Sequence, residues 1–169
     1  MQTFQRRYYR SLGQFGSDMV WPFRHRKQVK QAMRGGQVSF AFRERLMLAV
    51  TAVNECRYCS YYHVKEALKA ELSEAEIEAM LAGTVENAPA EELPALLFAQ
   101  HWAESDANPD PEAREKLTAV YGEERAEAIE TVLRMIRIGN LSGNTWDYLL
   151  FRLSNGRKGM LEREKERQN

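Results

Sequence analysis

Long apolar runs, strand-type runs of valine and isoleucine, and cysteine are all scarce in this sequence of 169 residues. No apolar run approaches the roughly 20 residues that cross a bilayer, and the first residues, MQTFQRRYYRS, hold no apolar signal core. We therefore expect a soluble, cytoplasmic protein that does not bind membranes. Only five prolines and ten glycines interrupt a chain rich in Ala, Leu, Glu and Arg, which favours helix over sheet.

The expected fold class is all-α, a helical bundle. Apolar residues make up 44% of the chain, which is enough for one sizeable core, and the composition does not suggest two. We expect one core domain over residues 38–155. A basic helical arm over residues 1–37 precedes it, and a charged tail over residues 156–169 follows it.

The net charge is zero, but the charges are unevenly placed. Residues 1–34 carry eight Lys or Arg against one acid, a net of +7, and residues 157–169 carry five against three, a net of +2. The middle of the chain is therefore at −9. The favoured interpretation is that the basic arm packs on the acidic body or on a neighbouring subunit. No nucleic-acid-reading motif accompanies the charge, so we expect no nucleic-acid partner.

Turn and cap signals divide the chain into short helices. We expect helices over residues 3–13, 24–34, 40–53, 55–70, 73–83, 93–105, 110–121, 123–138 and 140–153. Pro22 and Gly139 are interpreted as breaks, and Asn54 as the cap of the helix that follows it. Ser73 and Glu76 have the S-x-x-E spacing of a capping box, the strongest helix-start signal in the sequence.

Both cysteines lie in one stretch, ERLMLAVTAVNECRYCSYYH, over residues 44–63. Helical spacing places Cys56 and Cys59 one turn apart, with His63 a further turn along the same face. Glu44 precedes Cys56 by twelve residues on an apolar segment that can fold back onto the next helix. A carboxylate there could meet the thiols.

The C-x-x-C spacing at a helix start favours redox chemistry. Unpaired N–H groups and the positive end of the helix dipole stabilise a thiolate, which is the attacking form of cysteine. A cysteine oxidised to sulfenic acid could then condense with its neighbour into a disulfide, which an external thiol would reset. Two thiolates, an imidazole and a carboxylate also suit zinc, and an inert buried pair is the third possibility. The spacing alone leaves all three open.

The arrangement of Glu44, the segment NECRYC over residues 54–59, and His63 resembles the signature of the carboxymuconolactone decarboxylase superfamily, in its alkylhydroperoxidase D-like (AhpD-like) branch. In that branch a glutamate stands twelve residues before an N-x-C-x-x-C-x-x-x-H motif. The resemblance extends over roughly residues 38–153. The sequence departs from the pattern at Tyr58, where the best-studied members carry a second histidine.

The resemblance implies an AhpD-like helical bundle that assembles into trimers or hexamers and acts without a cofactor or a metal. The implied activity is that of a thiol-dependent peroxidase or disulfide reductase. Cys59 would attack the hydroperoxide, Cys56 would be the resolving partner and proton donor, and Glu44 would be the base acting through His63. The implied reductant is a dithiol, thioredoxin-like or lipoyl-type. Decarboxylases of the superfamily lack this cysteine pair, so decarboxylation is disfavoured. A zinc-binding or non-catalytic redox adaptor is the alternative.

Overall fold

The computed structural model describes residues 3–166 and is all-α, with no strand in that range. Its helices are α1 (Leu12–Arg24), α2 (Arg26–Arg34), α3 (Phe40–Asn54), α4 (Arg57–Lys69), α5 (Glu74–Leu81), α6 (Leu93–Glu104), α7 (Pro111–Tyr121), α8 (Glu123–Leu153) and α9 (Glu162–Glu166). The predicted fold class is therefore confirmed. None of the helices described is both long enough and apolar enough to cross a bilayer.

Helix α3 is the centre of the core. It packs against α4, α5, α6 and α8, and its apolar side chains point to every side of the helix. Leu46, Leu48 and Val50 are fully buried, as expected for a helix without a solvent face. The helix begins where the Ser39 hydroxyl accepts a hydrogen bond from the Phe42 amide at 3.1 Å.

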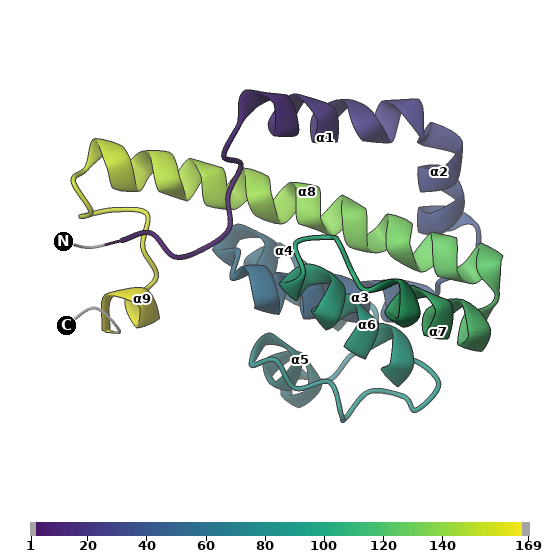
Figure 1. Ribbon diagram of the computed structural model, residues 1–169. Coiled ribbons are helices and arrows are strands. Elements are labelled where there is room, and N and C mark those ends of the chain that lie inside the picture. The colour runs from purple at the N-terminus through teal and green to yellow at the C-terminus, as the bar shows by residue number, and fades with distance from the viewer. Residues whose placement is uncertain (1–2, 167–169) are drawn as a thin grey trace.

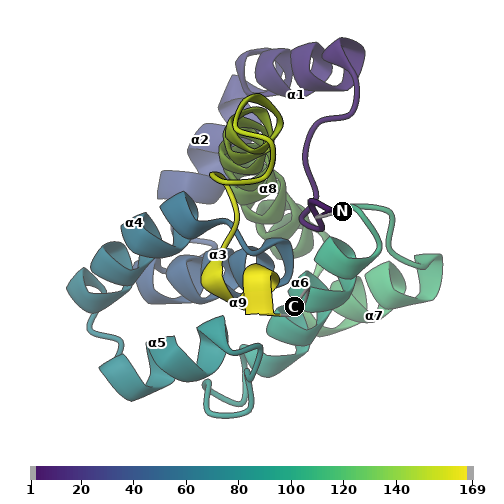
Figure 2. The ribbon, with the colours of Figure 1, turned by 90° about the vertical axis from the view of Figure 1, so that its left-hand side faces the viewer.

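Helix α8 runs along the whole length of the molecule (Figure 1). Helices α1 and α2 lie along one side of it and α3 to α7 lie on the other, which is clearest in the view along α8 (Figure 2). Because α8 contacts both groups of helices, it forms the wall that the α3–α4 region faces. The ends of the described chain also meet, since α9 lies beside the first residues in both views.

The prediction for the N-terminal arm was wrong in its first half. Residues 3–10 are extended, and α1 covers the stretch expected to be a loop, including Pro22. The Ser11 hydroxyl caps α1 by accepting from the Gln14 amide at 3.1 Å. Proline costs one backbone hydrogen bond but fits helical φ, so here it only precedes a bend at His25. Buried contacts of Asp18 with α8 stabilise the helical conformation and offset the low helix propensity of the glycines in this stretch.

The predicted break at Gly139 was also wrong. The backbone continues as one helix of 31 residues from Glu123 to Leu153. Glycine disfavours a helix interior by only about 1 kcal/mol, and packing of α8 against α3 outweighs that cost. The other signals fared better: Ser73 caps α5 by accepting from the Glu76 amide at 3.2 Å, and α7 has the expected ends.

The arm and the tail both pack on the body of the same chain. Arg6 of the arm forms an ion pair with Asp147 of α8, as the charge distribution predicts. Arg6 also pairs with Glu164 of the tail, and Arg163 of the tail pairs with Glu55 of the body. In a second contact of the arm the charges are reversed, with the acid on the arm and the base on the body: Asp18 of the arm accepts a hydrogen bond from Arg137 of α8 at 3.1 Å. The predicted boundaries of the core domain, at residues 38 and 155, remain a prediction.

Candidate functional site

A sharp turn between α3 and α4 presents the two cysteines. Glu55 takes a left-handed conformation (φ 54°) that ends α3 and reverses the chain. Such a conformation is unfavourable for a residue with a side chain, so packing around the turn must hold it. Asn54 is the last residue of α3 rather than the cap of α4, which corrects our expectation; Cys56 occupies the cap position instead.

The two thiols are in contact. Their Sγ atoms lie 2.9 Å apart, and Cys56 Sγ also accepts a hydrogen bond from the Cys59 amide at 3.4 Å. Both cysteines are free thiols. Cys56 is fully buried, whereas the Cys59 residue is partly exposed, so Cys59 is the closer of the two to solvent. Little movement separates this arrangement from a disulfide, whose sulfur atoms are about 2.05 Å apart.

The two thiols differ in acidity. The hydrogen bond from Cys59 lowers the pKa of Cys56 to about 7, against the opposing effect of burial and with help from the backbone amides of Cys59 and Tyr58 and from the charge of Arg6. The same hydrogen bond, together with burial, raises the pKa of Cys59. The pair therefore loses its first proton from Cys56, around neutral pH, and the proton that remains lies on Cys59.

Glu44 and His63 form a second pair beside the first. Glu44 is buried in α3, and its Oε2 atom lies 2.7 Å from Nδ1 of His63 on α4. Arg43 contacts the other carboxylate oxygen at 3.4 Å. Within residues 3–166 neither Glu44 nor His63 hydrogen-bonds directly to a thiol. His63 follows Cys59 by one turn of α4, so the two pairs are neighbours along that helix.

Two glycines of α8 make room for the sulfur atoms. A Cβ atom on Gly139 would lie 3.7 Å from the Sγ of Cys59, an ordinary contact. A Cβ atom on Gly143 would lie only 2.8 Å from the Sγ of Cys56 and 3.1 Å from the ring of Tyr58. Glycine is therefore required at position 143 because the Cys56 sulfur and the Tyr58 ring lie too close for a side chain, and not because of the backbone conformation.

Buried asparagines join the turn to α8. Asn54 donates through Nδ2 to Oδ1 of Asn140 at 3.1 Å, and Asn140 donates in turn to the hydroxyl of Thr51 at 3.1 Å. Asn144 donates to the backbone carbonyl of Asn54 at 2.7 Å. All four side chains are almost fully buried, so these bonds fix the turn against α8.

A buried carboxylate of α8 binds the residues between the cysteines. Oδ1 of Asp147 accepts from Nη2 of Arg57 at 2.6 Å and from the Tyr58 hydroxyl at 2.9 Å. Oδ2 accepts from Nη1 of Arg6 at 2.7 Å. Tyr58, which lies between the two cysteines in sequence, thus has a defined partner in α8.

The sequence predicted the positions of all four candidate residues, in or at the start of α3 and α4, but the sequence analysis gave no role at the site to the wall that α8 contributes. Gly139, Asn140, Gly143, Asn144 and Asp147 form this wall. Their signal was a stripe of small and polar residues at helical spacing, on a helix whose buried positions before Gly139 are mainly apolar. Interpreting Gly139 as a break concealed it.

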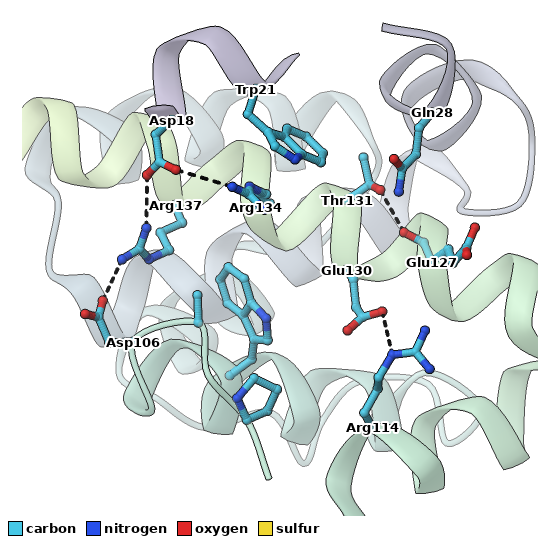
Figure 3. Close-up of a pocket in the computed structure, with 13 residues that line it drawn as sticks. Asp18, Trp21, Gln28, Asp106, Arg114, Glu127, Glu130, Thr131, Arg134 and Arg137 are labelled. Carbon is cyan, nitrogen blue, oxygen red and sulfur yellow. Dashed lines mark hydrogen bonds and ion pairs between the residues drawn. The ribbon is translucent and has the colours of Figure 1, made fainter. Parts of the chain in front are cut away.

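The molecule also has a cavity away from the four candidate residues. It measures about 480 Å³ and opens between α1, α8 and the segment after α6. Figure 3 shows its walls, in which Arg137 lies between Asp18 and Asp106, and Arg114 meets Glu130. None of the four candidate site residues lines it. Among the described residues, no group of three or more His, Cys, Asp or Glu side chains is arranged to hold a metal ion.

Comparison with known proteins gives one match. The model of the carboxymuconolactone decarboxylase family matches residues 22–105, a stretch that contains α3, α4 and all four candidate residues. The match ends before α8, so it does not include the wall behind the thiols. Neither a curated protein nor a solved structure matches this chain significantly.

Proposed function

Since this chain belongs to the carboxymuconolactone decarboxylase family, we propose that it is a thiol-dependent oxidoreductase of the AhpD-like branch that reduces hydroperoxides. The observation that carries the proposal is the contact of 2.9 Å between the sulfur atoms of a partly exposed and a fully buried cysteine, one of them acidic. A thiol pair held this close can form a disulfide after a single oxidation.

The proposed cycle has three steps. Sulfur of Cys59 attacks the outer oxygen of the hydroperoxide, which breaks the O–O bond and gives a sulfenic acid and an alcohol. Cys56 then attacks the sulfenic sulfur, forming the disulfide and releasing water. An external dithiol, thioredoxin-like or lipoyl-type, reduces the disulfide and leaves oxidised. Two electrons pass from the external dithiol to the peroxide, so no bound cofactor is needed.

Proton transfer follows from the asymmetry of the pair. Cys59 is the cysteine closer to solvent but holds the proton, and the Cys56 thiolate is positioned to take that proton as the attack begins. Cys56 then carries the proton that the departing alkoxide needs, which is the donor role expected of it. His63, oriented by Glu44 through Nδ1, leaves Nε2 to exchange protons with water when the disulfide forms.

Cysteine substitution tests the proposal directly. With an organic hydroperoxide and a dithiol reductant, Cys59→Ser should abolish turnover. Cys56→Ser is the matched control: without the dithiol it should still consume one equivalent of peroxide, more slowly because the Cys56 thiolate no longer takes the proton, and stop at a sulfenic acid that dimedone traps. Mass spectrometry of the wild type after one equivalent should show the loss of two hydrogens, located at Cys56 and Cys59. Full turnover by Cys59→Ser would refute the proposal.

Metal analysis tests the alternative of a zinc module. Protein purified without a chelator should contain no stoichiometric zinc if the thiols cycle as proposed. About one zinc ion per chain would favour the alternative, since thiolates that bind zinc are not free to attack a peroxide.

We also propose that the chain forms a homo-oligomer, a trimer or a hexamer. Support comes from large aromatic side chains that a single chain leaves exposed: Tyr61 and Tyr62, two and three residues after Cys59 on α4, and Trp146 on α8 are each more than half exposed. Exposed apolar surface of this kind is typical of interfaces. Light scattering coupled to gel filtration gives the mass, and a monomer at micromolar concentration would contradict this proposal.

A further inference from the structure

The carboxylate of Asp147 is held from both sides. The residue is fully buried, and its Oδ1 atom accepts from both residues between the cysteines, Arg57 at 2.6 Å and Tyr58 at 2.9 Å. Its Oδ2 atom accepts from Arg6 at 2.7 Å. Arg6 is fixed in turn by Glu164, whose carboxylate lies 3.2 Å from its Nε atom. The carboxylate therefore cannot rotate away without breaking buried ion pairs.

Arg57 and Tyr58 have few other constraints. The Tyr58 residue is 41% exposed, and the Arg57 side chain is 40% exposed. They occupy the first turn of α4, where backbone amides lack helical partners and the helix frays most readily. The backbone of these two residues determines how far apart the two sulfur atoms lie. Their bonds to Asp147 are therefore well placed to set that distance.

We infer that Asp147 is a positioning residue for the dithiol, acting through Arg57 and Tyr58 to hold the two sulfur atoms within bonding reach. The inference rests on the proposed dithiol–disulfide cycle. It also gives a role to residues outside the matched region, because Asp147 and its partner Arg6 both lie beyond residues 22–105.

The quantity to measure is the equilibrium constant between the Cys56–Cys59 disulfide and glutathione, which reports how well the fold brings the two thiols together. Asp147→Asn should reduce this constant about tenfold, the change expected when hydrogen bonds to a charged group are lost. Arg57→Gln combined with Tyr58→Phe should reduce it to a similar extent.

The chain offers a matched control. Asp18 is also a buried carboxylate that accepts from an arginine of α8, Arg137, and from a tyrosine hydroxyl, that of Tyr9 at 3.1 Å. It lies on the side of α8 that faces α1 and contacts neither cysteine. Asp18→Asn should destabilise the fold but leave the glutathione equilibrium unchanged. This control separates positioning from a general loss of stability.

A double-mutant cycle tests the route of action. If Asp147 acts through Arg57 and Tyr58, then Asp147→Asn should cause no further change in a chain that already carries Arg57→Gln and Tyr58→Phe. An undiminished effect in that background would overturn the inference, since it would show that the carboxylate acts on the thiols directly. An Asp147→Asn protein with the wild-type constant would overturn it as well.

Two further outcomes are informative. Should Asp147→Asn fail to fold, the partly exposed Arg57→Gln, Tyr58→Phe variant decides alone, and a wild-type constant in that variant overturns the inference. A wild-type protein that forms no Cys56–Cys59 disulfide would instead overturn the proposed function, and this inference with it. Because the measurement uses glutathione rather than peroxide, the two failures are distinguishable.

Discussion

Replacing Gly143 with alanine tests the tightest contact at the candidate site. The added methyl group would lie 2.8 Å from the Sγ of Cys56 and 3.1 Å from the Tyr58 ring, both shorter than normal contacts. Cys56 is fully buried and its sulfur accepts from the Cys59 amide, so it has little room to move. Overpacking of this kind costs about 1–3 kcal/mol.

Gly139→Ala is the control on the same helix. Its methyl group would make an ordinary contact of 3.7 Å with the Sγ of Cys59. Alanine in place of glycine favours a helix interior by roughly 0.5–1 kcal/mol at either position. Gly139→Ala should therefore be neutral or slightly stabilising, and Gly143→Ala should be about 1–3 kcal/mol less stable than Gly139→Ala.

Urea denaturation of both reduced variants measures the difference in free energy of unfolding. A stopped-flow measurement of thiol oxidation by hydroperoxide follows the sulfur atoms themselves, and Gly143→Ala should slow it because Cys56 must shift. If Gly143→Ala were as stable as Gly139→Ala and reacted as fast as the wild type, the close packing of α8 against the thiols would be refuted.

Three other perturbations have defined outcomes. The pKa of Cys56 is lowered to about 7 from an ordinary 9.0, so its ionisation stabilises the fold fully above pH 9 and progressively less as the pH falls through 7. From pH 7 to pH 9 the reduced wild type should therefore gain about 1–3 kcal/mol in free energy of unfolding relative to Cys56→Ser, as measured by urea titration. Glu44→Gln removes the carboxylate that orients His63, so peroxide turnover at pH 7 should fall by roughly 100-fold. The Cys56–Cys59 disulfide should still form when the variant is oxidised slowly. An unchanged turnover rate would exclude Glu44 from the proton path. Ser73→Ala removes the cap of α5, remote from the thiols, and should lower the free energy of unfolding by about 1 kcal/mol with wild-type turnover.

Local signals in the sequence predicted the part of the candidate site that α3 and α4 form. Cys56 caps α4, and Cys59 and His63 lie one turn apart within it, so their spacing was enough to place them close together. The apolar pattern before them predicted that Glu44 would fold back, and it does, although it meets His63 rather than the thiols. Ser73 had a strong cap signal, and α5 begins where that signal places it.

The part of the candidate site that α8 and Arg6 form had no such local signal. Asp147 meets Arg6 and Arg57 from distant parts of the chain, and nothing near any of these residues indicates its partner. Gly139 has the same appearance in sequence whether it ends a helix or makes room for a sulfur atom. Pro22 was misleading for a related reason, since proline fits a helix that can forgo one hydrogen bond. Long-range packing decided each of these cases.

The continuity of α8 affects the choice of protein for biochemical work. A fragment covering only residues 22–105 would keep Glu44, Cys56, Cys59 and His63 yet expose the inner surface of their helices to water. Its thiols would then behave like those of a short peptide, with no hydrogen bond between the sulfur atoms and no fixed spacing. Assays of such a minimal fragment would therefore underestimate the thiol reactivity of the 169-residue chain. A fusion partner near residue 3 or residue 166 would adjoin the Arg6–Glu164 ion pair.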